Sequence, residues 1–206
     1  MKYLRTSAPE TGPAGSEGLS YVYVLPCAYE DLLKLGFSRD PLARLQTLHP
    51  RYYEFFDLDR GFLFETDTVA EARRLELRLR RALAEHNAPA PLTIRRAAGG
   101  HTEWYRGAYG ALREEMERQA GEGGIVHRPL SAWLHADLLA QRDLLFARAS
   151  ALLEGVEGDP DVLDRPEMSV VRQNALDTID AYRALRLPLE ECLPAALMDW
   201  HQRRAR

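Results

Sequence analysis

The sequence predicts a protein of the α/β (α+β) class: a small central antiparallel sheet flanked by helices, then an all-helical C-terminal domain. In the first half, short runs of β-branched and aromatic residues alternate with amphipathic helical patterns. The glycine-rich stretch 121–124 follows, and such clusters often separate domains. Beyond it only helical patterns occur. We therefore expect a disordered leader at 1–19, an α/β domain at 20–120 and a helical domain at 125–206.

The first elements follow from local composition. The leader is rich in Pro, Gly and Ser and has little to bury. A strand is expected at 21–25, and a second strand at 32–38 follows a short loop. Asp40 is the expected N-cap of a helix that has Pro41 at its first position, where the missing N–H costs nothing. Pro50 ends this helix.

A third strand and a longer helix come next. The strand is expected at 61–65. Thr66-Asp67-Thr68 then caps a helix expected over 69–86, because its apolar residues fall on one stripe. The remaining expected elements are a loop at 87–100, a short strand at 101–105 and helices at 108–119, 130–154, 168–186 and 190–204.

Composition and charge narrow the possible functions. The 206 residues are 46% hydrophobic and 28% charged, as in ordinary globular proteins. The net charge of -4 gives no overall basic field that would attract a nucleic acid. Residues 1–110 contain 15 Lys and Arg against 14 Asp and Glu, a charge of +1, and residues 111–206 contain 12 against 17, a charge of -5. A nucleic-acid surface is therefore expected only as a local patch in the first half.

Neither a membrane anchor nor a disulfide framework is expected. No apolar run reaches the roughly 18 residues that a membrane span needs, and the N-terminus lacks the pattern of a signal peptide. Cys27 and Cys192 are the only cysteines, and they form no CxxC motif, so a structural zinc site is not expected either. We expect a cytoplasmic protein.

Four residues with chemically useful side chains fall at separate places in these elements. Tyr23 lies in the first strand, Lys34 in the second and Arg44 on the first helix. Glu76 lies on the longer helix, beside its apolar stripe. A carboxylate in that position is expected to face the sheet rather than bulk water.

The stretch from Tyr21 to about Tyr105 resembles the GIY-YIG nuclease family, and most closely its phage-type branch. The matching segments are YVYVL at 21–25, KLGFSRDPLARLQTL at 34–48, ARRLELRL at 72–79 and EWY at 103–105. The ordered set with its spacing carries the resemblance, rather than any single segment. Tyr21 stands in place of the first glycine of the family name, and Lys34 in place of the second tyrosine.

The resemblance implies a metal-dependent endonuclease that hydrolyses phosphodiester bonds in DNA, with Glu76 holding Mg²⁺ or Mn²⁺. Such hydrolysis needs a nucleophilic water, a proton acceptor and positive charge near phosphorus. One carboxylate and several waters suit Mg²⁺. The resemblance also implies that Arg44 contacts the phosphate, that Tyr23 positions or deprotonates the attacking water, and that Lys34 is auxiliary. Lysine at this place would bind phosphate or act as a base.

Other residues carry weaker signals. Candidates for nucleic-acid binding in the basic stretch around Glu76 are Arg73, Arg80, Arg95 and Arg96. A solvated helix face is the alternative for these arginines. An aromatic cluster that either stacks on bases or fills a core consists of Tyr52, Tyr53, Phe55 and Phe56. Glu103-Trp104-Tyr105 is expected to be structural, with its aromatic rings closing the core.

Three functions remain open at this point. The first is the endonuclease described above. The second is a nucleic-acid-binding module of the same fold that does not cut, which the missing tyrosine and the modest charge favour. The third is an interaction protein whose acidic helical domain, 125–206, docks a protein partner or self-associates.

Overall fold

The computed structural model describes residues 17–204, apart from the side chains of Glu17 and Arg96. A six-stranded antiparallel sheet with helices is followed by a largely helical part, which confirms the predicted fold class. The described chain divides into two compact units. The first unit contains the described residues up to His49 together with Leu63–Val126, and the second contains Pro50–Phe62 and the residues from His127 onward.

The strands of the sheet lie in the order β4-β5-β2-β1-β3-β6. Their bounds are β1 Glu17–Pro26, β2 Leu32–Ser38, β3 Phe62–Thr68, β4 Asn87–Ala88, β5 Trp104–Arg106 and β6 Val126–His127. Alternating apolar residues of β1 and β2 fill the core, since Val22, Val24 and Leu35 are completely buried. The long central pair, β1 and β2, is therefore a rigid support for the polar side chains that these strands carry.

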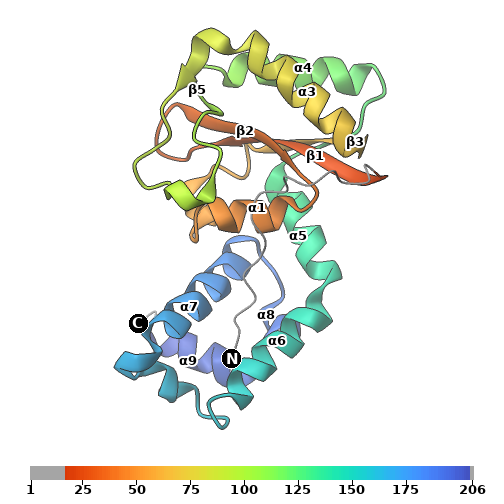
Figure 1. Ribbon diagram of the computed structural model, residues 1–206. Coiled ribbons are helices and arrows are strands. Elements are labelled where there is room, and N and C mark those ends of the chain that lie inside the picture. Colours follow the sequence, from red (N-terminus) through yellow and green to blue (C-terminus); the bar gives the residue numbers. More distant parts are fainter. Residues whose placement is uncertain (1–16, 205–206) are drawn as a thin grey trace. The chain divides into compact units, whose positions relative to one another are not determined.

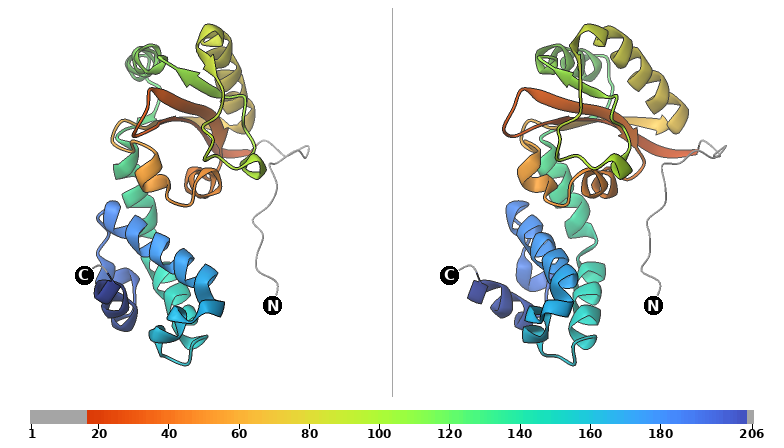
Figure 2. Two further views of the ribbon diagram at one scale, coloured as in Figure 1. Left: turned by 90° about the vertical axis from the view of Figure 1, so that its left-hand side faces the viewer. Right: turned by 60° about the vertical axis from the view of Figure 1, so that its left-hand side comes forward.

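Helices of the first unit cover both faces of this sheet. Figure 1 shows α3 (Val69–Ala82) and α4 (Tyr109–Gly121) on one face and α1 (Pro41–Leu48) on the other, and the views in Figure 2 agree. The expected caps are present: the Asp40 carboxylate accepts from Ala43 N at 2.8 Å, and the Thr68 hydroxyl accepts from Glu71 N at 3.2 Å. Local sequence therefore starts α1 and α3 where predicted.

Several boundaries differ from those predicted. β1 begins at Glu17, so 17–19 belong to a strand and not to the expected leader; the rest of that leader lies outside the described residues. α3 ends at Ala82 and continues as a short 3-10 turn, Ala84–His86. β4 and β6, two residues each, were not predicted because such short strands carry no periodic pattern.

The second unit contains more helices than predicted. The expected helix at 130–154 is two helices, α5 (Leu130–Ala140) and α6 (Arg142–Glu154), which meet at Gln141 without a Gly or Pro to mark the break. The expected helix at 190–204 is also two, α8 (Leu189–Cys192) and α9 (Ala195–Arg204). Here Pro194 forces the preceding residue into an extended conformation. α7 (Ser169–Ala184) is close to its prediction. None of the described helices has the length and apolar character needed to cross a bilayer.

The segment Pro50–Phe62 belongs with the helices and not with the sheet that surrounds it in sequence. Its short helix α2 (Tyr52–Phe55) packs against α7. Arg51 Nη1 donates to Asp177 Oδ1 at 3.1 Å, and the rings of Tyr52 and Phe56 are each 2% exposed. Tyr52 and Phe56 are therefore core residues. The predicted domain at 20–120 stays a prediction, and within it the segment Pro50–Phe62 packs with the helices of the second unit.

Candidate functional site

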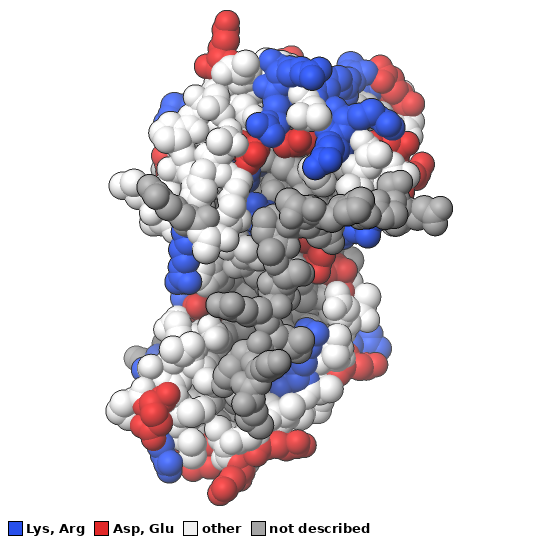
Figure 3. Space-filling view, viewed as in Figure 1, with Lys and Arg blue, Asp and Glu red and all other residues white. Residues whose placement is uncertain are grey.

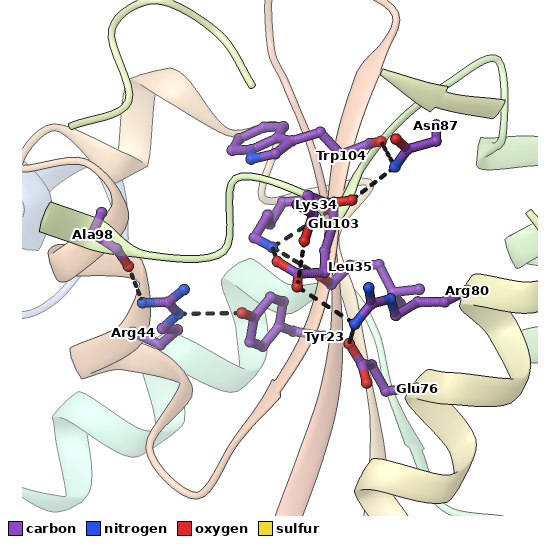
Figure 4. A network of polar contacts seen from close by, with 11 residues as sticks. Tyr23, Lys34, Leu35, Arg44, Glu76, Arg80, Asn87, Ala98, Glu103 and Trp104 are labelled. Carbon is purple, nitrogen blue, oxygen red and sulfur yellow. Dashed lines mark hydrogen bonds and ion pairs between the residues drawn. The ribbon is translucent and has the colours of Figure 1, made fainter. Parts of the chain in front are cut away.

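Side chains from four elements of the first unit lie close together around the central strands of the sheet (Figure 4). They are Tyr23 from β1, Lys34 from β2, Arg44 from α1 and Glu76 from α3. Tyr23 pairs with Gly36 across the two strands, and Lys34 lies two residues before Gly36. Because side chains two residues apart share a face, Tyr23 and Lys34 point to the same side of the sheet.

Gly36 makes room for Tyr23. A Cβ added to Gly36 would lie 2.3 Å from the Tyr23 hydroxyl oxygen and 2.6 Å from the carbon that bears it. Any side chain at this place would force the Tyr23 ring to shift, because real Cβ atoms do not approach that closely. The glycine of the KLG segment thus lets the tyrosine ring cross β2 and reach α1.

Arg44 joins the tyrosine to a loop. Its Nε donates to the Tyr23 hydroxyl at 3.2 Å, and its Nη1 donates to the Ala98 carbonyl at 2.6 Å. Burial raises the pKa of Tyr23 above its usual value, and the Arg44 guanidinium opposes this shift only in part. At neutral pH the phenol is therefore protonated and can donate a hydrogen bond.

Lys34 is 1% exposed and forms an ion pair with Glu103, the residue before β5. Its Nζ lies 2.9 Å from Glu103 Oε2 and 3.1 Å from the Leu35 carbonyl. Burial lowers the pKa of Lys34 to about 8, although the Glu103 carboxylate acts in the opposite direction. An ammonium with this pKa loses its proton within reach of neutral pH.

The carboxylates of Glu76 and Glu103 form ion pairs with the same guanidinium, that of Arg80. Arg80 Nη1 lies 3.3 Å from Glu76 Oε1 and 3.4 Å from Glu103 Oε1. Burial raises the pKa of Glu76, and Arg80 only partly offsets this. Burial alone would also raise the pKa of Glu103, but Lys34, Thr102 and Arg80 together lower it. The two carboxylates thus have opposite pKa shifts, as is common at catalytic sites.

Gly100 lies directly on the charged groups. A Cβ added to it would lie 2.9 Å from Arg44 Nη2, 2.9 Å from Lys34 Nζ and 3.0 Å from Glu103 Oε2. Its φ of +68° is also in the region that favours glycine. The loop before β5 therefore lies so close to the charged groups that a side chain at position 100 would clash with them.

The four predicted site residues thus lie in one connected cluster, but three contributors were not predicted. Glu103 was assigned a structural role with its neighbours, whose rings are indeed buried: Trp104 is 0% and Tyr105 2% exposed. The Ala98 carbonyl and Gly100 come from a stretch expected to be only a loop. A carboxylate beside a short strand and two adjacent glycines were the available signals.

The predicted nucleic-acid-binding arginines differ in their surroundings. Arg73 is exposed on α3 and Arg95 is exposed in the loop before β5. The side chain of Arg96 lies outside the described residues. Arg80 is partly buried and turned toward the carboxylates instead of the solvent. Figure 3 shows Lys and Arg side chains gathered over the part of the molecule that contains α3.

The donor set is compatible with a hydrated divalent cation. Within residues 17–204, no group of three or more His, Cys, Asp and Glu side chains could hold a metal ion. The Glu76 and Glu103 oxygens nevertheless converge on a single positive charge, which Arg80 supplies. Mg²⁺ keeps several waters and needs only one or two carboxylates, so these residues fit such an ion.

The first unit is thus a mixed α/β domain in which a tyrosine, a lysine, two arginines and two carboxylates lie around the central strands of the sheet. Residues 20–120 match the family model of the T5orf172 domain, which falls in the GIY-YIG-like nuclease group. Searches of curated proteins and of solved structures returned no match. The matched range includes every residue of the cluster described above.

Proposed function

We propose that this protein is a metal-dependent endonuclease of the phage-type GIY-YIG branch that hydrolyses phosphodiester bonds in DNA. The observation that carries the proposal is the convergence of Tyr23, Lys34, Arg44 and Glu76 from four separate elements. Neither burial nor helix stability requires these four polar groups to meet. The T5orf172 match supports the same class of activity.

The residues would divide the work as follows. Arg44 binds a non-bridging phosphate oxygen and stabilises the charge that develops in the transition state. Tyr23, whose hydroxyl lies 3.2 Å from Arg44 Nε, orients the attacking water. Lys34 has a pKa of about 8 and takes up a proton or contacts the phosphate. Glu76 would hold Mg²⁺ or Mn²⁺, which supplies Lewis-acid stabilisation of the phosphate when bound.

The substrate contacts are proposed at exposed arginines. Arg73 is exposed on α3 and Arg95 in the loop before β5, and both can contact backbone phosphates; we propose the same role for Arg96. Such contacts would place the duplex without selecting its sequence. The cluster itself contains Lys34, Arg44 and Arg80 against Glu76 and Glu103, a formal charge of +1, which suits a phosphate.

Cleavage of supercoiled plasmid DNA with Mg²⁺ or Mn²⁺ tests the proposal. The full chain is expected to nick the plasmid, and Glu76→Gln should reduce the rate by at least about a hundredfold, as loss of a catalytic charge contact does. Glu71→Gln is the matched control, since Glu71 lies on the same helix but its carboxylate is 42% exposed and paired with Arg74. Equal rates for the two variants would exclude Glu76 from catalysis.

A non-catalytic nucleic-acid-binding module is the second candidate. The contact that favours it is the 2.6 Å hydrogen bond between Arg44 Nη1 and the Ala98 carbonyl, which occupies the guanidinium proposed to bind phosphate. A gel shift with the same DNA distinguishes the two functions. Binding without cleavage at any metal concentration would favour the module over the enzyme.

We also propose that the helical part, within 125–206, docks a protein partner or self-associates. Its support is its acidic charge, since residues 125–206 contain 10 Lys and Arg against 13 Asp and Glu, a charge of -3, which does not suit a nucleic acid. Light scattering of the full chain would give the mass in solution. A monomeric mass would exclude self-association and leave only a different partner.

A further inference from the structure

Arg80 is the one cation of the cluster that contacts both carboxylates. Its Nη1 lies 3.3 Å from Glu76 Oε1 and 3.4 Å from Glu103 Oε1. The same atom therefore lies where two carboxylate oxygens from distant parts of the chain converge, as Figure 4 shows. A divalent cation held between Glu76 and Glu103 would need this location, because a metal ion and a guanidinium cannot both contact the same oxygen pair closely.

We propose that Arg80 occupies the place of the divalent cation in the metal-free protein and competes with that cation for Glu76 and Glu103. This inference rests on the proposed nuclease function and extends it in two ways. It names Glu103 as a second carboxylate that faces the cation. It also gives Arg80 a role at the carboxylates that precedes any contact with DNA.

The two oxygens of Glu103 have different partners, which makes this role possible. Oε2 binds the buried Lys34 ammonium at 2.9 Å, while Oε1 faces Arg80 and the Thr102 hydroxyl. Lys34 thus fixes the carboxylate in place from one side. The other side remains directed at Arg80 and can exchange a guanidinium for a hydrated metal ion without disturbing the Lys34 pair.

Arg80 can leave this place more easily than Lys34 can. Its side chain is 34% exposed, whereas that of Lys34 is 1% exposed. Its two ion pairs are also longer than the 2.9 Å Lys34 pair. A change of rotamer costs a long, partly exposed arginine little free energy, because water solvates its guanidinium in the new position.

Charge explains why the exchange is needed. Lys34, Arg44 and Arg80 together carry +3, and Glu76 with Glu103 carry -2. If a divalent cation were added while Arg80 stayed in place, the formal charge of the cluster would rise from +1 to +3. When Arg80 leaves, the increase is smaller, and the released guanidinium can bind a phosphate of the substrate. Metal binding and phosphate binding would then favour one another.

Binding of Mn²⁺ to the full chain, without nucleic acid, tests the inference. Free Mn²⁺ is measured by electron paramagnetic resonance at constant pH. Arg80→Gln removes the competing charge and should tighten Mn²⁺ binding by about fivefold, the value of a modest ion pair. The matched control is Arg78→Gln on the same helix, because Arg78 pairs with Glu115 on the surface. An Arg80→Gln affinity equal to or weaker than wild type would overturn the inference.

The same titration separates this inference from the proposed function. Glu76→Gln should abolish Mn²⁺ binding whether or not Arg80 competes. If Glu76→Gln binds Mn²⁺ like the wild type, both the proposed metal site and the role of Arg80 are wrong. If Glu76→Gln loses the ion but Arg80→Gln gains no affinity, only the role of Arg80 is wrong.

A second measurement uses the wild-type chain and does not depend on whether a variant folds. Mg²⁺ is titrated while the arginine Nε–Hε signals are followed by NMR. The Arg80 signal should shift and narrow as its guanidinium leaves the carboxylates, and the Arg78 signal should stay unchanged. A static Arg80 signal at saturating Mg²⁺ would contradict the exchange.

Discussion

Lys34 illustrates how burial changes the chemistry of one residue. The resemblance placed it where the family name has a tyrosine, and the structure places it between the Glu103 carboxylate at 2.9 Å and the Trp104 ring, with Nζ 5.9 Å from the ring centre. A fully buried ammonium is costly unless it is paired. Its one carboxylate partner therefore matters to stability as well as to function.

The lowered pKa of Lys34 predicts a pH dependence of stability. Its pKa falls from 10.5 to about 8 on folding. Between these values the folded state has released a proton that the unfolded state still holds, so the contribution of Lys34 to stability rises with pH. Below pH 8 its burial penalty is fully present. The rise is at most about 3 kcal/mol over the whole window.

Urea unfolding of the wild type and of Lys34→Met at several pH values between 7.5 and 9.5 would measure this. Effects of Cys and Tyr titration are common to both proteins and cancel in the difference. The free energy of unfolding of the wild type should increase with pH relative to that of Lys34→Met. Parallel profiles would mean that the folded protein does not depress the Lys34 pKa.

At the scale of elements, the loop between Arg96–Ala98 and β5 lies directly against the charged cluster. Gly99 and Gly100 both have positive φ, +66° and +68°. They differ in what a side chain would meet. Among described residues no atom lies within 4 Å of a Cβ added to Gly99, whereas three charged groups lie within 3.0 Å at Gly100. The two glycines therefore form a matched pair for mutation.

Both Gly99→Ala and Gly100→Ala should lower stability by about 1 kcal/mol, since alanine is strained at positive φ. Only Gly100→Ala should also displace Arg44, Lys34 and Glu103, and it should lower the plasmid cleavage rate by at least about tenfold relative to Gly99→Ala. Thermal unfolding and the cleavage assay measure the two effects separately. Identical cleavage rates would show that the loop geometry does not affect the site.

At the scale of the whole molecule, the chain passes between its two compact units at three places. The crossings lie near residues 49, 62 and 126. Pro50–Phe62 carries Tyr52, Phe56 and Leu58, which are buried. Backbone bonds attach its end to α5, since Leu130 N donates to Gly61 O at 2.8 Å and Ser131 N to Leu58 O at 3.0 Å. Division of the chain at the glycine-rich stretch would separate this segment from its partners.

A fragment that ends at residue 124 is therefore expected to be unstable and to bind a hydrophobic dye, because it exposes three large apolar side chains. The same fragment with Tyr52, Phe56 and Leu58 changed to Ser should remain soluble and show a cooperative thermal transition. Dye fluorescence and circular dichroism make the comparison. Equal behaviour of the two fragments would show that Pro50–Phe62 needs no helical partner.

The sequence alone determined the order of the longer strands and helices of the first half, the caps at Asp40 and Thr68, and the elements that carry Tyr23, Lys34, Arg44 and Glu76. Apolar periodicity and capping depend on neighbouring residues, so they are readable without a structure. No apolar periodicity or capping residue marks the break at Gln141 or the two-residue strands β4 and β6. No local pattern shows that Pro50–Phe62 packs with helices from the second half of the chain, so the sequence alone places this segment in the range 20–120.

Only the tertiary structure decided which charges meet. Glu103 joins the cluster through Lys34, and Arg80 turns to Glu76 rather than to solvent. Gly100 lies against the charged ends of Arg44, Lys34 and Glu103. Each of these contacts joins residues through space, and most of them come from elements far apart in the chain. Burial and pairing depend on the complete surroundings of a side chain, and folding alone brings those surroundings together.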